Sequence, residues 1–456
     1  MVSIIIILFS SFALDSILEQ PLLDHAHVGM IVIDLERDSV VYSNNYRKLL
    51  VPASNAKIVT SAAALMFLGQ DFRFRTYLGI GGQIRSGRLR GDIIVQGGGD
   101  PSFSLENIEQ FVTALKDQGI TEIEGNIILD DSYFTEERLP VGWAWHYLDA
   151  RYAAEVSALS LNRNVVNVHI ESTRPGQPAN VTIEPFTRYV KLVNDMITKM
   201  GDDSIIIFRR PEANIIYVDG GIGFRKKRDI EVSVKDPTFY FGEYFKERLV
   251  ASDIRVKGNC VEDETSNDGM TARYNIVDSV LSQPMLEILK ELNSESVNLF
   301  GEAILKTLGS HFLRNGSFHG GVSILKEFLR RCGVDTSLVA WYDGSGLSRH
   351  NLISPYDIAL VLRRMYHSAM FDTFYRLLPA PGEGTMIGRF GGLKGFLRAK
   401  TGTLHAVSCL SGYLNVGKKY YCFSMMFNNF SCPRRQIESI QENLLNAILV
   451  FLKEET

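Results

Sequence analysis

The sequence has few cysteines, and they are not arranged as metal ligands. Five occur in 456 residues, and no pair shows Cys-x-x-Cys spacing, so the pattern typical of a structural zinc site is missing. Cys409 and Cys422 lie in apolar, strand-like runs. We therefore expect buried thiols there. A disulfide between Cys422 and Cys432 is an alternative that no other feature of the sequence supports.

A strong positive charge is also missing. The chain has 48 Lys and Arg against 52 Asp and Glu, which gives a net charge of -4. This mildly acidic balance implies no basic face, so we expect no nucleic-acid partner. No heptad array, low-complexity tract or internal repeat stands out. The composition, 45% hydrophobic and 22% charged, is that of a globular protein, and the length predicts two or three domains.

A continuous apolar run marks the N-terminus. Val2 to Leu14 is almost wholly apolar, and Ser11-Phe12-Ala13 offers small residues for cleavage. We interpret residues 1–14 as a secretory signal, although its first residues lack Lys and Arg. A membrane-tethering segment or a buried strand is the alternative. The run is too short to span a bilayer as a helix. Export to the periplasm or cell envelope is expected.

The pattern of elements changes twice along the chain. Residues 28–44 are typical of a β-hairpin, and 54–68 of a buried helix that ends at Gly69. Residues 71–270 alternate short strand-like runs with Gly-rich turns, around one helix at 105–117. They predict a strand-rich insertion with two nested subdomains. The turn at 97–100 is no phosphate loop, because no Gly-Lys-Ser/Thr follows it.

Helical periodicity returns near residue 283. Helices are expected at 284–290, 297–309, 322–331 and 436–453, a strand at 396–403, and a hairpin at 406–427 that turns at 415–418. The two N-terminal and three C-terminal strands can pair into one antiparallel five-stranded sheet flanked by helices. The fold class is therefore α+β, with a discontinuous domain of residues 15–70 and 271–456.

Ser54-Asn55-Ala56-Lys57 is a Ser-x-x-Lys motif at a helix start. Residues three apart share a helical face, about 5–6 Å between Cβ atoms, so Lys57 can reach the Ser54 hydroxyl. The Ser54 N–H at the positive helix end favours an oxyanion. A capping serine with a solvated lysine is the alternative. Ser323-Ile324-Leu325-Lys326 also matches the pattern, but it lies inside an amphipathic helix and after every Ser-x-Asn.

Ser-x-Asn occurs three times, beginning at Ser43, Ser160 and Ser296. Ser43 precedes the nucleophile and is predicted to lie in a turn, and Ser160 is predicted in a strand of the insertion. Ser296 follows a polar loop at 293–295 and precedes a helix, so Ser296 and Asn298 are the candidates. Simple helix capping is the alternative.

Lys400-Thr401-Gly402-Thr403 occurs once, in a strand-type run. Lys400 is predicted to face a cleft, Gly402 to admit a ligand backbone, and Thr401 and Thr403 to offer hydroxyls to a substrate carboxylate. The Thr403 N–H could complete an oxyanion hole with that of Ser54.

The order Ser-x-x-Lys, Ser-x-Asn, Lys-Thr-Gly indicates a serine acyl-transfer enzyme with a lysine base. An ordinary lysine, with a pKa of about 10.4, is a poor base near neutrality. Burial or a second cation lowers it. We predict a lowered pKa for Lys57, with Lys400 as that cation.

Together these motifs resemble the class C low-molecular-mass penicillin-binding proteins, the D-alanyl-D-alanine carboxypeptidases and endopeptidases of peptidoglycan. Four further segments carry the resemblance: residues 96–101, 142–145, 342–348 and 404–413. So do Leu378-Pro379 and Gly384-Thr385. It covers nearly the whole chain after the apolar N-terminus.

This resemblance implies a β-lactamase-like (transpeptidase-like) domain with two nested insertion domains. It implies Ser54 as the acylated nucleophile, Lys57 as base, Ser296 as proton relay and Asn298 as the group that holds the substrate amide. Lys400 and Thr401 would fix the terminal carboxylate. The reaction needs no metal or other cofactor.

The expected function is a serine DD-carboxypeptidase, DD-endopeptidase or both, acting on stem peptides and inhibited by β-lactams. Peripheral membrane association is a further expectation. The alternatives are a β-lactamase and a non-catalytic wall-binding scaffold. One departure concerns the stem diamino acid. Many relatives carry an acidic residue after Trp-x-Trp, but here His146 and Tyr147 follow Trp145, and the nearest carboxylate is Asp149.

Overall fold

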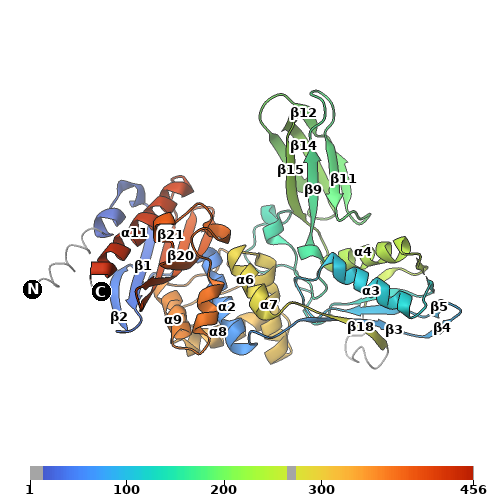
Figure 1. The fold of residues 1–456 in the computed structure, drawn as a ribbon, viewed down its shortest axis with the longest axis horizontal. Helices are drawn as coiled ribbons and strands as arrows, with labels where there is room; N and C mark the ends of the chain where they lie inside the picture. The colour runs from blue at the N-terminus through green and yellow to red at the C-terminus, as the bar shows by residue number, and fades with distance from the viewer. Residues whose placement is uncertain (1–13, 264–273, 455–456) are drawn as a thin grey trace, which may run out of the picture.

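The computed structural model describes residues 14–263 and 274–454. The molecule is elongated (Figure 1), with a sheet and its covering helices at one end and the inserted region at the other. The predicted signal of residues 1–14 lies almost entirely outside the described residues.

A five-stranded antiparallel sheet joins the two ends of the sequence. Its order is β19–β20–β21–β1–β2. This confirms the predicted sheet and the α+β class. The hairpin turn is tighter than expected, because 415 and 416 belong to β20 and only 417 and 418 connect it to β21. The strands are β1 (His27–Asp34), β2 (Ser39–Asn44), β19 (Leu397–Leu404), β20 (Val407–Val416) and β21 (Lys419–Asn428).

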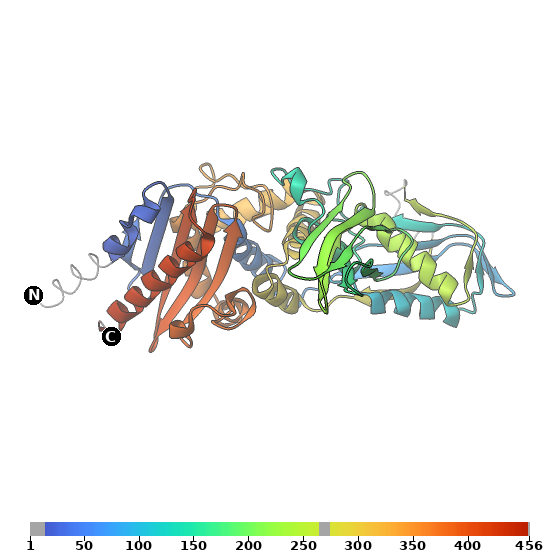
Figure 2. The same ribbon diagram turned by 90° about the horizontal axis from the view of Figure 1, so that it is seen from above.

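Both faces of this sheet are buried, since side chains alternate along a strand. Met30 and Val32 of β1 pack in a core with α11 (Arg434–Glu454), which crosses one face (Figure 2). Ile31 and Ile33 pack in a second core, toward the helices on the other face. Those helices are α2 (Ala56–Phe67), α6 (Met285–Ser294), α7 (Asn298–Leu313), α8 (Phe318–Arg331), α9 (Pro355–Tyr366) and α10 (Phe371–Leu377).

Three predictions about the Ser-x-Asn matches are wrong. Ser43 lies in β2 rather than in a turn. Ser160 is buried in an irregular segment rather than a strand, where its hydroxyl donates to the Ser157 carbonyl. Residues 293 and 294 end α6 instead of forming a polar loop, because the apolar face of that helix extends to Leu292. Only 295–297 separate α6 from α7.

The inserted region has a core of its own, built around Phe103, Phe111, Phe241 and Phe245. Two sheets, β17–β8–β6–β3–β18 and β16–β7–β5–β4, pack with two helices around it. The elements are β3 (Arg75–Ile80), β4 (Gln83–Arg85), β5 (Arg88–Arg90), β6 (Ile93–Gln96), α3 (Leu105–Asp117), β7 (Glu122–Ile123), β8 (Ile127–Asp130), α4 (Pro237–Ala251), β16 (Arg255–Val256), β17 (Cys260–Glu262) and β18 (Asn275–Leu281).

A smaller β-structure projects from this region (Figure 1). Its two sheets are β10–β9–β15 and β11–β14–β12, with β13 paired to β14. The strands are β9 (Val165–Glu171), β10 (Asn180–Glu184), β11 (Lys191–Asn194), β12 (Ile197–Lys199), β13 (Ser204–Arg209), β14 (Ile215–Gly223) and β15 (Lys227–Ser233). Since β18 still pairs with β3, residues 275–281 lie with the inserted sheets. The division at 70 and 271 stays a prediction.

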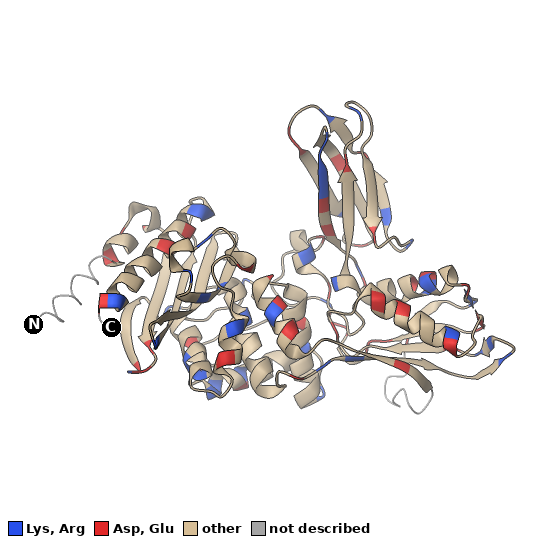
Figure 3. Cartoon of the chain, in the orientation of Figure 1, with Lys and Arg blue, Asp and Glu red and all other residues tan. Residues whose placement is uncertain are grey.

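Charges of both signs are interspersed over the helices and strands (Figure 3). Within the described residues, no helix is long and apolar enough to cross a membrane. The five cysteines are free thiols, and Cys409 and Cys422 are buried as predicted. The alternative disulfide between Cys422 and Cys432 is therefore not formed.

Phe241→Ala tests whether the inserted core is stabilised separately. Phe241 is fully buried, 5.2 Å from the Phe103 ring, and its truncation should cost about 3–5 kcal/mol. Calorimetry should show a lowered transition for the inserted region and an unchanged transition for the five-stranded sheet and its helices. Val250→Ala, at an exposed site on the same helix, should change neither. Equal loss of both calorimetric transitions would contradict separate cores.

Candidate active site

Ser54 lies in a short 3-10 turn, Ala53–Asn55, immediately before α2. This corrects the prediction that it opens the α-helix itself. Ala53 adopts a left-handed φ of 47°, a costly conformation for a residue with a side chain. Ser54 is partly exposed, whereas the residues around it are buried. The turn therefore presents one hydroxyl to the solvent side of a packed helix.

Lys57 lies beneath Ser54 and is fully buried. Its Nζ donates to Ser54 Oγ at 3.0 Å, to Asn298 Oδ1 at 2.6 Å and to the Ser345 carbonyl at 2.8 Å. An ammonium group has three donors, so these acceptors use all of them. The predicted contact between Lys57 and Ser54 is present.

Burial lowers the pKa of Lys57 to about 7, while the carboxylates of Asp343 and Glu302 oppose this. The direction agrees with the prediction, but the cause is removal from water rather than the charge of Lys400. The pKa of Lys400 is itself lowered well below its ordinary value, first by burial and then by Lys57. The site thus contains two buried lysines, each with a lowered pKa.

Ser296 lies between α6 and α7, in a left-handed conformation with φ 58°. Its Oγ accepts a hydrogen bond from Lys400 Nζ at 3.1 Å, and the same ammonium donates to the Thr401 carbonyl at 2.9 Å. The strained backbone at Ser296 turns its hydroxyl toward β19. The structure therefore brings the second motif against the third.

Asn298 begins α7 and uses both ends of its amide. Its Oδ1 accepts from Lys57, and its Nδ2 donates to the carbonyl of Tyr152 at 2.7 Å. Tyr152 belongs to the turn Arg151–Ala153 of the inserted region. The residue expected to hold a substrate amide thus joins Lys57 to the inserted region.

β19 is an edge strand of the five-stranded antiparallel sheet that contains β1 and β2, and it passes close to the Ser54 turn. A Cβ added to Gly402 would lie 3.0 Å from the Ser54 amide nitrogen and 2.9 Å from the Pro52 carbonyl oxygen, so only glycine fits without displacement. Thr401 Oγ1 lies 2.7 Å from Thr385 Oγ1. β19 and the turn that carries Ser54 therefore form one continuous wall.

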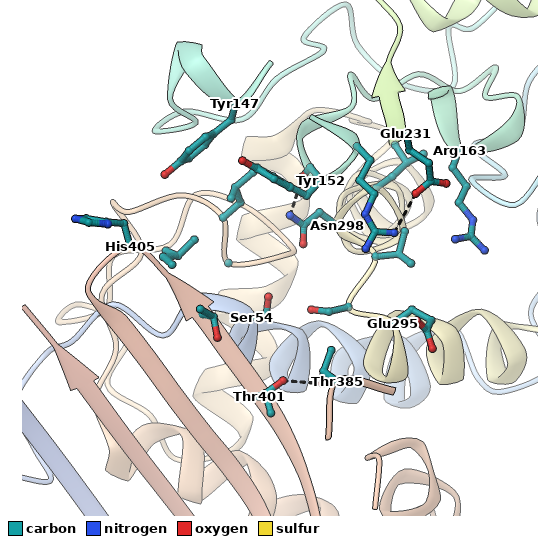
Figure 4. A pocket seen from close by; sticks show the side chains of 18 of the residues that line it. Ser54, Tyr147, Tyr152, Arg163, Glu231, Glu295, Asn298, Thr385, Thr401 and His405 are labelled. Carbon is teal, nitrogen blue, oxygen red and sulfur yellow. Dashed lines mark hydrogen bonds and ion pairs between the residues drawn. The ribbon is translucent and has the colours of Figure 1, made fainter. Parts of the chain in front are cut away.

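A cleft of about 810 Å³ opens above these groups (Figure 4). Ser54, Ser296, Asn298, Thr401 and Thr403 line it. Lys57 and Lys400 do not line it, because they are fully buried. The prediction that Lys400 faces the cleft is therefore wrong. The predicted serines therefore meet solvent, and the predicted lysines support them from beneath.

Tyr152 and Glu231 line the cleft although the sequence did not indicate them, whereas Tyr147 and the segment at 293–295 had been singled out. Tyr147 and Tyr152 line the cleft from the insertion, with Glu231 of β15, and Glu295 lines it from the segment after α6 (Figure 4). Asp149 lines a neighbouring pocket instead. Since Glu231 reaches the cleft through the fold of the nested sheets, spacing along the chain could not have indicated it.

The chain is similar to known D-Ala-D-Ala carboxypeptidases. The model of the D-Ala-D-Ala carboxypeptidase 3 (S13) family matches residues 11–447. A D-alanyl-D-alanine carboxypeptidase of Actinomadura sp. (strain R39) is 30% identical over 438 residues, which cover 92% of this chain and 81% of the relative. The carboxypeptidase DacB of Haemophilus influenzae is 26% identical and covers 95% and 93%.

The fold has a solved counterpart as well. The crystal structure of penicillin-binding protein 4 from Haemophilus influenzae superposes with a TM-score of 0.84, at 23% identity, over 96% of this chain and 99% of that one. That likeness shows the shared fold. Since the family model spans most of the sequence, the chain belongs to the D-Ala-D-Ala carboxypeptidase 3 (S13) family.

Proposed function

We propose that Ser54 is the nucleophile through which this family member acts as a serine D-Ala-D-Ala carboxypeptidase, and that Lys57 is its base. One observation carries the proposal. The Nζ of Lys57 lies 3.0 Å from Ser54 Oγ, and burial brings its pKa to about 7. A neutral fraction of Lys57 can therefore accept the serine proton near neutral pH.

The proposed reaction has two steps. Ser54 Oγ attacks the carbonyl carbon between two D-alanines and passes its proton to Lys57. The C–N bond then breaks, and the leaving amine takes the proton that Lys57 had accepted, relayed through the Ser296 hydroxyl. In the second step Lys57 accepts a proton from the water molecule that attacks the acyl-enzyme and returns it to Ser54 as the peptide carboxylate leaves. The hydrogen bond from Lys400 to Ser296 supports this relay.

Charge stabilisation is proposed for the edge of β19. The N–H groups of Ser54 and Thr403 would donate to the oxyanion. The close approach of Gly402 to the Ser54 amide supports this pairing. The Thr401 hydroxyl would contact the terminal carboxylate, with the charge of Lys400 beneath the cleft floor favouring it, and Asn298 would meet the substrate amide.

Peptidoglycan stem peptides are the proposed substrates, and β-lactams the proposed inhibitors. A crystal structure of penicillin-binding protein 4 from Haemophilus influenzae carries a β-lactam. Cleavage of cross-linked stems is the same reaction with a larger leaving amine, so the same site would serve a DD-endopeptidase. Groups of both charges line the cleft: Arg151 and Glu231 form an ion pair there, with 3.1 Å between Nη1 and Oε2.

This substrate implies a place of action. We propose that the chain is exported and acts in the cell envelope, where peptidoglycan lies. Periplasmic location and peripheral association with the membrane stay predictions.

Ser54→Ala should abolish both penicillin labelling and D-alanine release from a pentapeptide stem. Intact-protein mass spectrometry after penicillin treatment should show one lasting adduct on the wild type and none on the variant. Ser323→Ala, at the other Ser-x-x-Lys match, is the control and should label normally. Rapid turnover of penicillin without a lasting adduct would favour a β-lactamase instead.

The acylation rate should rise with pH through about 7 and then level off. Below its lowered pKa, Lys57 is protonated and cannot accept a proton from Ser54, and above it Lys57 is neutral. An ordinary lysine would supply roughly a thousandfold less neutral base at pH 7. Stopped-flow acylation by a chromogenic β-lactam from pH 5 to 10 measures the midpoint. A midpoint near 10 would show that Lys57 has no lowered pKa.

Thr401→Val should weaken binding of substrates that end in a free carboxylate. Removing a hydroxyl that meets a charged group should reduce kcat/KM about tenfold or more. The loss should be smaller for the same peptide ending in an amide. Thr113→Val, on the exposed face of α3, is the matched control. Equal losses for both peptides would remove the carboxylate role.

A further inference from the structure

Glu302 is a fully buried carboxylate that the proposed reaction does not use. It lies on α7, four residues after Asn298, and therefore on the same helical face. Its Oε2 accepts the Gly344 N–H and its Oε1 accepts the Ser345 N–H, both at 2.8 Å. One carboxylate thus holds two successive backbone amides.

The loop that Glu302 holds also holds the base. The Ser345 carbonyl accepts a hydrogen bond from Lys57 Nζ at 2.8 Å. The Gly344 carbonyl accepts one from Thr60 Oγ1 on α2 at 2.6 Å. The loop therefore transmits the position of α7 to the ammonium group on α2.

This loop packs closely against backbone on two sides. A Cβ added to Gly344 would lie 2.2 Å from the Gly301 carbonyl oxygen of α7. A Cβ added to Gly346, which has φ 84°, would lie 1.8 Å from the Ala53 carbonyl oxygen beside the nucleophile. Backbone meets backbone on both sides, so the hydrogen bonds of Glu302 act on a loop that touches the Ser54 turn.

The second carboxylate of the cluster is already occupied. Asp343 Oδ1 accepts from Gly346 N and Asn351 Nδ2, and its Oδ2 accepts from Ser348 N and Trp143 Nε1. These bonds brace the loop and join it to the insertion. The Gly346 N–H belongs to the same peptide unit as the Ser345 carbonyl, so Asp343 also holds this acceptor of Lys57. Glu302 holds the two preceding amides of the loop from α7.

Four ionisable groups act electrostatically on Glu302 or on Lys57. Asp343 and Lys57 act on Glu302, and Lys306, one turn further along α7, interacts with it as well. Lys57 also interacts electrostatically with Lys400. Burial and Asp343 raise the pKa of Glu302, while the two loop amides, each of which donates to one of its oxygens, and Lys57 favour its ionised form. Negative charge on Glu302 in turn raises the pKa of Lys57.

We propose that Glu302 is a positioning residue for Lys57: its carboxylate fixes the Gly344–Ser345 backbone, and its charge tunes the base. This inference rests on the proposed role of Lys57. It makes two separable claims. Loss of the amide contacts displaces the Ser345 carbonyl and slows acylation, and loss of the charge makes Lys57 easier to deprotonate.

Glu302→Gln separates these effects from a merely structural role. The variant keeps the shape of the side chain but places an NH2 group against one of the two loop amides. The limiting acylation rate should fall about 10- to 100-fold. The rising limb of its pH profile should move to lower pH by about half a unit or more. Stopped-flow acylation by a chromogenic β-lactam from pH 5 to 10, on protein with a verified melting transition, measures both.

Three further variants divide the claims. Thr60→Val removes the other restraint on Gly344 without altering charge, so it should slow acylation and leave the midpoint in place. Glu302→Asp keeps the charge on a shorter side chain and should behave likewise; these two also serve if Glu302→Gln does not fold. Asp92→Asn is the matched control, since it makes the same carboxylate-to-amide change in the inserted region. Its Oδ1 accepts the Asn126 N–H at 2.7 Å, so the variant should lower stability and leave both kinetic quantities unchanged.

The outcomes distinguish this inference from the function on which it rests. A wild type that forms no Ser54 adduct would overturn the proposed function. If the wild type is acylated and Glu302→Gln matches it in limiting rate and midpoint, only the positioning role fails. If Glu302→Gln does not fold, an unslowed Glu302→Asp or Thr60→Val would overturn the positioning claim, and a displaced midpoint in Glu302→Asp the charge claim.

Discussion

The site depends on the three hydrogen bonds that the buried ammonium group of Lys57 donates. A lysine taken fully out of water is costly unless every donor finds an acceptor. Here the acceptors come from three places: the turn before α2, the start of α7 and the loop at Ser345. Each of these segments must hold its position for the others to be satisfied. The same burial that needs this support gives the amine a pKa suited to catalysis.

The architecture supplies that support from both ends of the chain. β1 and β2 pair with three strands from the C-terminus, and α2 packs against the sheet they form. The edge strand β19 then lies beside the Ser54 turn, close enough that residue 402 must lack a side chain. Closing the sheet from distant segments is what brings the first and third motifs together.

The inserted region takes part in the site. The Tyr152 carbonyl accepts from Asn298, and the indole of Trp143 donates to Asp343 at 2.9 Å. One contact reaches the amide beside the base, and the other reaches the loop that Glu302 holds. Tyr147 and Glu231 extend the cleft wall toward the nested sheets. The insertion therefore shapes the substrate cleft and braces the proposed catalytic groups at once.

The sequence by itself determined the motifs, their order and most elements. Spacing of three between Ser54 and Lys57 sets their distance wherever a helix forms, and alternation of apolar residues marks the strands. The helix at 105–117 was predicted with its observed bounds, since its polar and apolar faces are sharply divided. Local patterns were weaker at Ser43, Ser160 and residues 293–295, where tertiary packing decided the conformation.

Only the tertiary structure decided which backbone carbonyl accepts from Lys57 and which carboxylates hold the loop beside it. Glu302 stands four residues after Asn298, so a shared helical face could be inferred, but its contact with residues 344 and 345 could not. The Tyr152 and Ser345 carbonyls belong to the backbone, so the residue type at these positions could not predict their contacts. Burial of Lys57 likewise arises from packing between segments hundreds of residues apart. The sequence identified the candidate reacting groups, and the fold determined their burial, their hydrogen-bond partners and hence their pKa values.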